Sequence, residues 1–257
     1  MKRRLTYRFG TVLLACTRAA ICFGDDGGGT PARSACADLP SAAELKAQLI
    51  AAPSLSNPPV EGGMVGGLFG GTRMWAAVVN RNGEVCSVAA STSDSTQVWP
   101  GSQAIAKAKA YTANAFSLDD FALSTARLYT FTQPGHSLAS LGQSNPFSPG
   151  AVAAPGDSSA GNNKIAGGMI FFGGGVALYR NGKILGGLGV SGDTSCADHE
   201  IAKRVRHLLD MNPGGGALVD DIKYTVIDGG TPFAHPLCLN TYRNGAFIGT
   251  EANAATY

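Results

Sequence analysis

The chain has 257 residues, of which 44% are hydrophobic and 15% are charged. This length and apolar content suit one folded domain, or two at most, and exclude a wholly disordered chain. Glycine reaches 35 residues without a Gly-X-Y repeat, which excludes collagen, and no apolar run reaches the ~18 residues of a membrane-spanning helix.

The net charge of +2 depends on the N-terminus. Five of the 20 basic residues lie in the first 24 positions, which contain no acidic residue, so 15 basic and 18 acidic residues remain beyond them. Because nucleic-acid binding depends on many contacts between Lys or Arg and phosphate, we expect no nucleic-acid partner.

Residues 1–24 have the pattern of an export signal, with a basic start and a short apolar core from Phe9 to Cys16. Leu13 to Cys16 is similar to a lipoprotein processing box, in which Cys16 would be acylated. A cleaved soluble leader is the alternative, and Cys22 is a second candidate for the lipid. The glycine-rich residues 25–35 then predict a flexible tether. We therefore expect an exported protein of the periplasm or cell envelope, held at the membrane by a lipid alone.

Four cysteines lie beyond the leader. An even number in an exported chain predicts two disulfides. Of the three possible pairings we favour Cys36–Cys86 and Cys196–Cys238, because each closes a loop within its own half of the chain. A metal site is the less favoured alternative, because neither C-x-x-C nor H-x-x-x-H occurs.

Residues 36–257 are expected to form one domain of α+β class. The sequence predicts helices over residues 41–52, 101–116, 118–128 and 195–211, the first and last with capping boxes. It predicts strands over residues 74–80, 84–90, 165–172, 176–179, 183–190 and 223–228. Asn-Gly pairs at 82–83, 181–182 and 244–245 indicate tight hairpins, so we expect an antiparallel sheet with helices packed on it. Residues 130–164 form a long loop of a length that is usually functional.

Lys109 lies on the apolar stripe of the helix over residues 101–116, together with Ile105, Ala108 and Thr112, whereas Lys107 points away. An ammonium group on such a stripe must find a partner or reach water. Lys109 therefore either extends to water at the helix edge or offers positive charge to an anionic ligand.

Asp198 lies on the buried side of the helix over residues 195–211, with Ile201 and Val205, and His199 lies opposite. A carboxylate in the first turn can cap free N–H groups. Asp198 is therefore either a cap or an inward carboxylate facing Lys109. We expect His199 at the surface or in a subunit contact.

Several chemical motifs are missing from the sequence. The glycines at 173–175 and 186–189 are not followed by a Walker Lys-Ser/Thr, and no G-x-S-x-G is present. Glycines within strands mark places where another group approaches the backbone, either a neighbouring helix or a flat ligand. Of the four histidines, His136 lies in the long loop, where it is either simply solvated or the best placed of the four to act as a metal ligand.

Three segments together resemble the GlcG/HbpS family of haem-binding, often labelled haem-degrading, proteins. They are IAKAKAYTA at 105–113, GGGVALYRNGKILGGLGVSG at 173–192 and DHEIA at 198–202. The resemblance covers roughly residues 74–211, and the positions carried over are Lys109, Thr112, Gly189, Ser191, Gly192 and Asp198. The chain departs from the family pattern at Val176-Ala177, at His199 and in its long loop. The resemblance implies a sheet of about five antiparallel strands flanked by helices, homo-oligomers and tetrapyrrole binding.

These observations favour a protein that binds haem, or another tetrapyrrole or small anionic ligand, without covalent attachment. Lys109, supported by Thr112 and Asp198, would face a propionate. Trp99, Phe131 and Phe172 would form an apolar wall, and His136 or a Tyr would approach the iron. One alternative is an enzyme that acts on a small anionic metabolite or a tetrapyrrole, with Lys109 and Asp198 as its acid/base pair. Another is a non-catalytic sensory or structural module with a filled interior.

Overall fold

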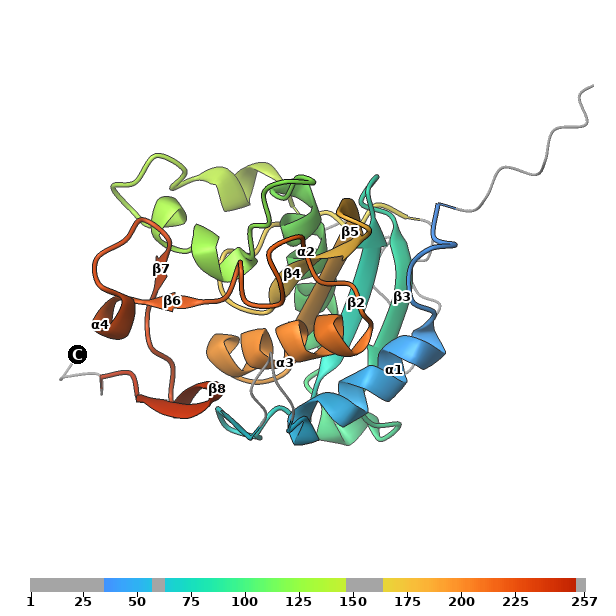
Figure 1. Cartoon of the computed structure of the whole chain (residues 1–257), viewed down its shortest axis with the longest axis horizontal. Helices are drawn as coiled ribbons and strands as arrows, with labels where there is room; N and C mark the ends of the chain where they lie inside the picture. Colours follow the sequence, from blue (N-terminus) through green and yellow to red (C-terminus); the bar gives the residue numbers. More distant parts are fainter. Residues whose placement is uncertain (1–34, 57–62, 147–163, 253–257) are drawn as a thin grey trace, which may run out of the picture. The chain divides into compact units, whose positions relative to one another are not determined.

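A computed structural model describes residues 35–56, 63–146 and 164–252 (Figure 1). The chain divides into two compact units, Met1–Arg33 and Ser34–Tyr257, and all described residues belong to the second unit. The predicted leader and all of the predicted tether except residue 35 lie outside the described residues. Within the described ranges, the helices are too short or too polar to cross a membrane.

A four-stranded antiparallel sheet forms the centre of the described fold (Figure 1). The first hairpin consists of β2 (Trp75–Asn80) and β3 (Val85–Ala90), and the second of β4 (Gly175–Arg180) and β5 (Lys183–Ser191). The strand order is β3-β2-β5-β4, so the two hairpins join through β2 and β5. This architecture confirms the predicted α+β class.

The strand predicted over residues 165–172 is reduced to isolated bridge residues, among them Ile165, which pairs antiparallel with Glu84 at the outer side of β3. Gly167 and Gly168 follow with positive φ angles of 63° and 74°, which turn the chain away from the sheet. In the described part of the chain, the central sheet therefore has four full strands rather than about five.

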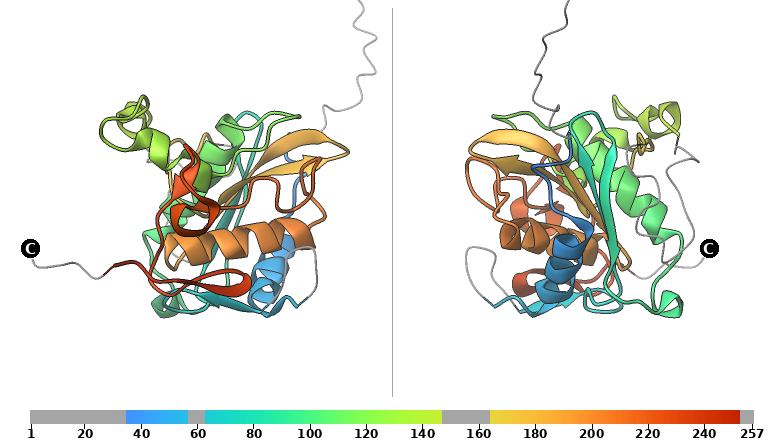
Figure 2. Two further views of the ribbon diagram at one scale, coloured as in Figure 1. Left: turned by 60° about the vertical axis from the view of Figure 1, so that its left-hand side comes forward. Right: turned by 90° about the vertical axis from the view of Figure 1, so that its right-hand side faces the viewer.

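Helices cover both faces of the sheet (Figure 2). Helix α2 (Ser102–Ala115) packs on one face, and α1 (Ala42–Ala51) and α3 (Ser195–Leu208) pack on the other. The α1/α3 side holds an apolar cluster that includes Leu45, Leu49, Val78, Leu188, Ile201 and Val205. The α2 side holds a second cluster that includes Trp75, Ala77, Val79, Ala106 and Ala110.

Small elements complete the fold around α3. Strand β1 (Met64–Gly66) pairs antiparallel with β8 (Thr241–Gly249), and β6 (Lys223–Tyr224) pairs parallel with β7 (Ala234–His235). A single helical turn, α4 (Thr225–Asp228), follows β6, so the strand predicted over residues 223–228 ends after two residues.

The helix predicted over residues 118–128 is wrong for most of its length. Leu118 and Phe121 form a tight bridge, and only Thr125–Leu128 is helical, as a 3-10 turn. The Ser117 hydroxyl donates to the Leu123 carbonyl oxygen and accepts from the Leu123 N–H, which closes residues 117–123 into a loop. This local pairing competes with the helical hydrogen bonds.

The helix caps were predicted in one case and missed in the other. Ser41 and Glu44 form the expected capping box at the start of α1. At α3 the cap is Thr194, whose hydroxyl accepts from the Ala197 N–H at 3.3 Å, so the capping box predicted between Ser195 and Asp198 is wrong. The Asp198 carboxylate instead forms an ion pair with Lys109, described below.

Both predicted disulfides are present. Cys36–Cys86 ties the segment before α1 to β3. Cys196–Cys238 ties the first turn of α3 to the segment between β7 and β8. The proposed pairing, with each bond in its own half of the chain, is therefore confirmed.

Helix α2 rests directly on the backbone of β5. A Cβ atom placed on Gly189 would lie 1.9 Å from the Ala106 carbonyl oxygen, and one on Gly187 would lie 2.2 Å from the Ala110 carbonyl oxygen. The glycines of this strand therefore accommodate a neighbouring helix, which was one of the two alternatives for them.

We expect Gly189→Ala to lower the free energy of unfolding by about 2 kcal/mol or more, because the new methyl group would push α2 off the sheet. Gly214→Ala is the matched control, because its Cβ would meet no atom within 4 Å. Urea unfolding followed by circular dichroism measures both. Equal stability of the two variants would contradict the close packing of α2 on β5.

Candidate functional site

Lys109 and Asp198 form a buried ion pair between α2 and α3. Lys109 Nζ lies 2.6 Å from Asp198 Oδ2 and 3.0 Å from the Val190 carbonyl oxygen. The two residues are 0% and 1% exposed. Lys109 thus neither reaches water nor faces open space. Of the two alternatives for Asp198, the structure has the inward carboxylate that faces Lys109.

The ion pair lies beside Gly174, a residue without a side chain at the end of the sheet. A Cβ on Gly174 would lie 2.7 Å from Lys109 Nζ and 2.9 Å from Asp198 Cβ. Gly174 also has a φ angle of 117°, which L side chains rarely adopt. Within the glycine run at 173–175, Gly174 therefore makes room for this ion pair.

Asp193 supports Asp198 from outside the pair. Asp198 Oδ1 accepts from the Asp193 N–H at 2.9 Å. The Asp193 carboxylate in turn accepts from the N–H groups of Leu68 and Phe69, at 2.6 and 2.8 Å. The sequence analysis missed Asp193, for which the available signal was a carboxylate just before a helix start.

Burial shifts the pKa values of the two partners toward each other. Burial raises the pKa of Asp198 to about 6, against the opposing effect of the Lys109 charge. Burial likewise lowers the pKa of Lys109, against the opposing effect of the Asp198 charge. The two groups are 2.6 Å apart and buried, so no solute reaches the pair in this closed arrangement.

Two other predicted site residues lie beside this pair. The Phe172 ring centroid is 5.0 Å from Lys109 Nζ, and the ring is half-buried. The Thr112 hydroxyl donates to the Ala108 carbonyl oxygen and accepts from the Ile170 N–H at 3.0 Å. The structure therefore brings together four predicted cofactor-binding residues, namely Lys109, Thr112, Phe172 and Asp198.

The other three predicted site residues contact different parts of the chain. Trp99 is exposed and packs edge-on against Phe69. Phe131 packs against Phe233, with ring centroids 5.5 Å apart. His136 is exposed in the loop that begins at residue 130. These residues do not form one wall with Phe172 in the described contacts.

Phe172 belongs instead to an apolar strip formed by Met169, Ile170, Phe171 and Phe172, all half-buried. Phe171 packs edge-on against Phe116, and Gly142 lies against the Phe171 ring. The Gly168 N–H donates to the Pro146 carbonyl oxygen, so the loop that carries His136 packs along this strip. Phe172 was the only member singled out from the sequence.

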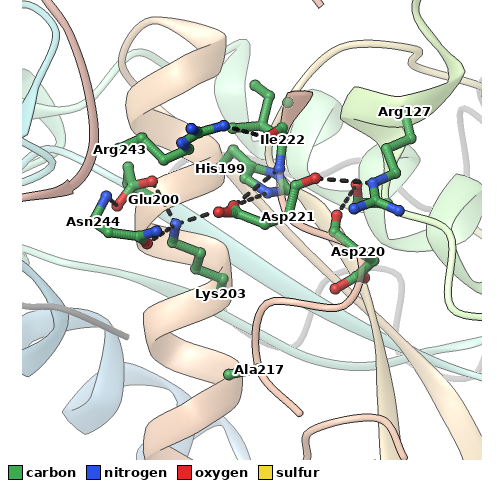
Figure 3. Close-up of polar contacts among 12 residues, drawn as sticks. Arg127, His199, Glu200, Lys203, Ala217, Asp220, Asp221, Ile222, Arg243 and Asn244 are labelled. Carbon is green, nitrogen blue, oxygen red and sulfur yellow. Dashed lines mark hydrogen bonds and ion pairs between the residues drawn. The ribbon is translucent and has the colours of Figure 1, made fainter. Parts of the chain in front are cut away.

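A network of buried charges covers the outer face of α3 (Figure 3). Lys203 Nζ lies 2.6 Å from Glu200 Oε1 and 3.0 Å from Asp221 Oδ1. His199 Nε2 lies 3.3 Å from the same Asp221 oxygen, and the Asn244 N–H donates to Glu200 Oε2. Asp221 and Asn244, which follow α3 in the chain, thus supply polar partners for the charged side chains of α3.

One helix-face prediction is wrong. His199 is 0% exposed rather than at the surface, because residues around Asp221 cover it. Lys107, which was predicted only to point away from the stripe of Lys109, is also buried, and its Nζ donates to the Gln103 side chain at 3.2 Å. Helical periodicity places a residue on a face but does not reveal which distant segment covers that face.

A family model described as "Haem degrading protein HbpS-like" matches residues 68–206, which is more than half of the chain. The chain belongs to the HbpS-like family. This finding confirms the resemblance drawn from residues 105–113, 173–192 and 198–202, all of which lie within the match. Residues 207–252, which supply Asp221 and Asn244 to the network on α3, lie beyond it.

Three of the solved structures that match the chain have TM-scores below 0.5. A PduOC–haem complex has 25% identity, with 55% of this chain and 80% of that chain covered and a TM-score of 0.39. The Klebsiella pneumoniae protein ORFY has 21% identity, with 65% and 89% covered and a TM-score of 0.42. HbpS has 19% identity, with 66% and 89% covered and a TM-score of 0.39. No curated protein matches the sequence.

We expect Lys109→Met to lower the free energy of unfolding by about 3–5 kcal/mol, because it leaves the buried Asp198 carboxylate without its cation. The double variant Lys109→Met/Asp198→Asn should recover much of this loss, because it removes the unpaired charge. Denaturant unfolding of the three proteins measures the effect. Lys183→Met, at an exposed ion pair with Asp119, is the control and should change stability little. A double variant less stable than Lys109→Met would refute this account.

Proposed function

We propose that this protein is exported, carries a lipid anchor on Cys16, and binds haem or a related tetrapyrrole without covalent attachment. Membership in the HbpS-like family carries the proposal, since the match over residues 68–206 contains Lys109, Phe172 and Asp198. As the family resemblance implies, the protein would assemble into homo-oligomers.

The apolar strip and the loop beside it suit the chemistry of haem. Met169, Ile170, Phe171 and Phe172 offer a partly exposed apolar surface to the flat face of a macrocycle. His136 is exposed in the loop packed along this strip and offers an accessible imidazole. Haem bound there would supply an iron centre able to take such a ligand.

In this proposal Lys109 is a positioning residue in the closed conformation. The Lys109 ammonium group contacts the Asp198 carboxylate, the Val190 carbonyl oxygen and the Phe172 ring. A propionate could therefore contact Nζ only if Phe172 moved. Thr112 holds the strip at the Ile170 N–H, one helical turn from Lys109. The ion pair and Thr112 together therefore fix the strip against α2.

A specific observation favours the enzyme alternative as a second candidate. The 2.6 Å contact between Lys109 and Asp198 and their converging pKa values match an acid/base pair. Because both side chains are buried, a substrate would need Phe172 or the glycine run at 173–175 to open. The filled surroundings of Lys109 are in turn what a non-catalytic module requires. Haem titration separates that module, which would not bind haemin, from a tetrapyrrole-binding protein or an enzyme that acts on a tetrapyrrole.

Stoichiometric haemin added to the purified protein should produce a Soret band that saturates with added protein. Lys109→Met/Asp198→Asn should weaken haemin binding by about 10-fold or more, equivalent to about 1.4 kcal/mol, because the strip that would bind the macrocycle loses the ion pair that positions it beside Phe172. Lys183→Met is the control and should bind as the unaltered chain does. An unchanged haemin spectrum at stoichiometric addition would contradict the proposed function.

The lipid anchor is tested in cells by metabolic labelling with a radioactive fatty acid. The full chain should incorporate the label and sediment with membranes. Cys16→Ser should lose both properties, whereas Cys22→Ser, the matched control within the leader, should keep them. Label retained in Cys16→Ser and lost in Cys22→Ser would move the anchor to Cys22, and no label in the unaltered chain would mean a soluble leader.

A further inference from the structure

Three potential metal ligands meet where the C-terminal segment is fastened to α3. The Sγ atoms of Cys196 and Cys238 and a ring nitrogen of His235 lie within 4.8 Å of one another. All three residues are buried. Cys196 comes from α3, His235 from β7 and Cys238 from the segment before β8, so tertiary structure rather than a short sequence motif brings them together. Two of the three lie beyond the family-matched residues.

The hydrogen bonds of His235 fix its tautomer. Nδ1 lies 2.7 Å from the Pro236 carbonyl oxygen, which can only accept, so Nδ1 carries the proton. The Gly173 N–H donates to Nε2 at 3.3 Å, so Nε2 carries a lone pair. Nε2 also lies 3.5 Å from the Ser195 hydroxyl, on the side of the cysteines. A histidine whose Nδ1–H is held by a carbonyl and whose Nε2 is unprotonated is oriented as metal-binding histidines are.

The surroundings of the sulfur atoms suit thiolates. The Cys196 N–H donates to Cys238 Sγ at 3.1 Å, and the Ser195 hydroxyl lies 3.2 Å from the same sulfur. Both groups belong to the first turn of α3, where free N–H groups favour negative charge. Two thiolates and one neutral imidazole are a common zinc ligand set. The Ser195 hydroxyl or a water molecule would provide an oxygen atom as the fourth ligand.

We propose that reduction of the Cys196–Cys238 disulfide, which links α3 to the C-terminal segment, creates a zinc site formed by Cys196, Cys238 and His235. A dithiol reductant supplies two electrons and two protons, the S–S bond breaks, and the reductant is oxidised to its own disulfide. Zn²⁺ then displaces the two thiol protons and binds both sulfurs and His235 Nε2. The C-terminal segment thus stays fastened to α3 in either state, by a covalent bond or by a metal ion.

The test uses the full chain, a phosphine reductant that does not bind zinc, and alkylation of thiols followed by peptide mass spectrometry. The phosphine takes its oxygen atom from water as it reduces the disulfides. One equivalent of Zn²⁺ should slow alkylation of Cys196 and Cys238 by about 10-fold or more and leave Cys36 and Cys86 unprotected. These two provide an internal control, because they come from the other disulfide. A chelator should restore full reactivity.

His235→Ala should abolish the protection, because it removes the nitrogen ligand, whereas His207→Ala should keep it. Co²⁺ in place of Zn²⁺ should give the absorption spectrum of a tetrahedral thiolate site in the reduced protein. The affinity for Co²⁺ should fall by at least about 100-fold in His235→Ala, which is more than the loss of a residue that only hydrogen-bonds to a metal ligand would cause. If reduction unfolds the C-terminal segment, Zn²⁺ should restore its circular dichroism. Equal protection of all four cysteines, an unchanged Co²⁺ spectrum in His235→Ala, or no recovery with Zn²⁺ would each overturn the proposal.

Discussion

The described fold depends on an ion pair that connects its two helical layers past the end of the sheet. Lys109 belongs to α2 on one face and Asp198 to α3 on the other, and their side chains meet beside Gly174, where β4 has not yet begun. The close packing of α2 on β5 brings Lys109 to this position, because a Cβ on Gly187 or Gly189 would clash with the backbone of the helix. A larger residue at either set of glycines would separate the charges, and a separated buried charge is costly.

The remaining buried charges follow the same rule. Lys203 pairs with both Glu200 and Asp221 on the outer face of α3, and Asp220 makes a two-pronged contact with Arg206. Each of these partners is enclosed, so the gain lies less in net stability than in a defined position for the C-terminal segment. The family-matched part of the chain and the segment that follows it are therefore joined by electrostatics as well as by a disulfide.

Local sequence signals predicted the elements whose causes are local. The Ser41–Glu44 capping box, the hairpin at Asn181-Gly182 and the inward direction of Lys109 depend on residues within a few positions of one another. Asn181 and Gly182 both have positive φ angles, as a tight turn requires, whereas at 82–83 only the glycine does. The disulfide pairing was also accessible, because two widely separated pairs of cysteines favour bonds within each half.

The failures have non-local causes. The burial of His199 depends on Asp221, 22 positions later, and the loop over residues 117–123 depends on the hydroxyl of Ser117 rather than on any periodic pattern. In the candidate site, sequence reasoning found Lys109 and Asp198 but not Asp193, nor the strip beside Phe172. Nothing in the spacing of Trp99 or Phe131 indicated that their rings pack against Phe69 and Phe233 instead.

The network on α3 also orders events during synthesis. When α3 leaves the ribosome, Lys203 has only Glu200 as a charged partner from the network, and Glu200 has only Lys203 and Arg204, because Asp221 and Asn244 have not yet been made. Dehydration of these side chains must wait for the last part of the chain, and so must oxidation of Cys196, whose partner is residue 238. A chain that ended after the family-matched region would leave these charged side chains hydrated and Cys196 as a free thiol, so the last part of the chain is what encloses this face of α3.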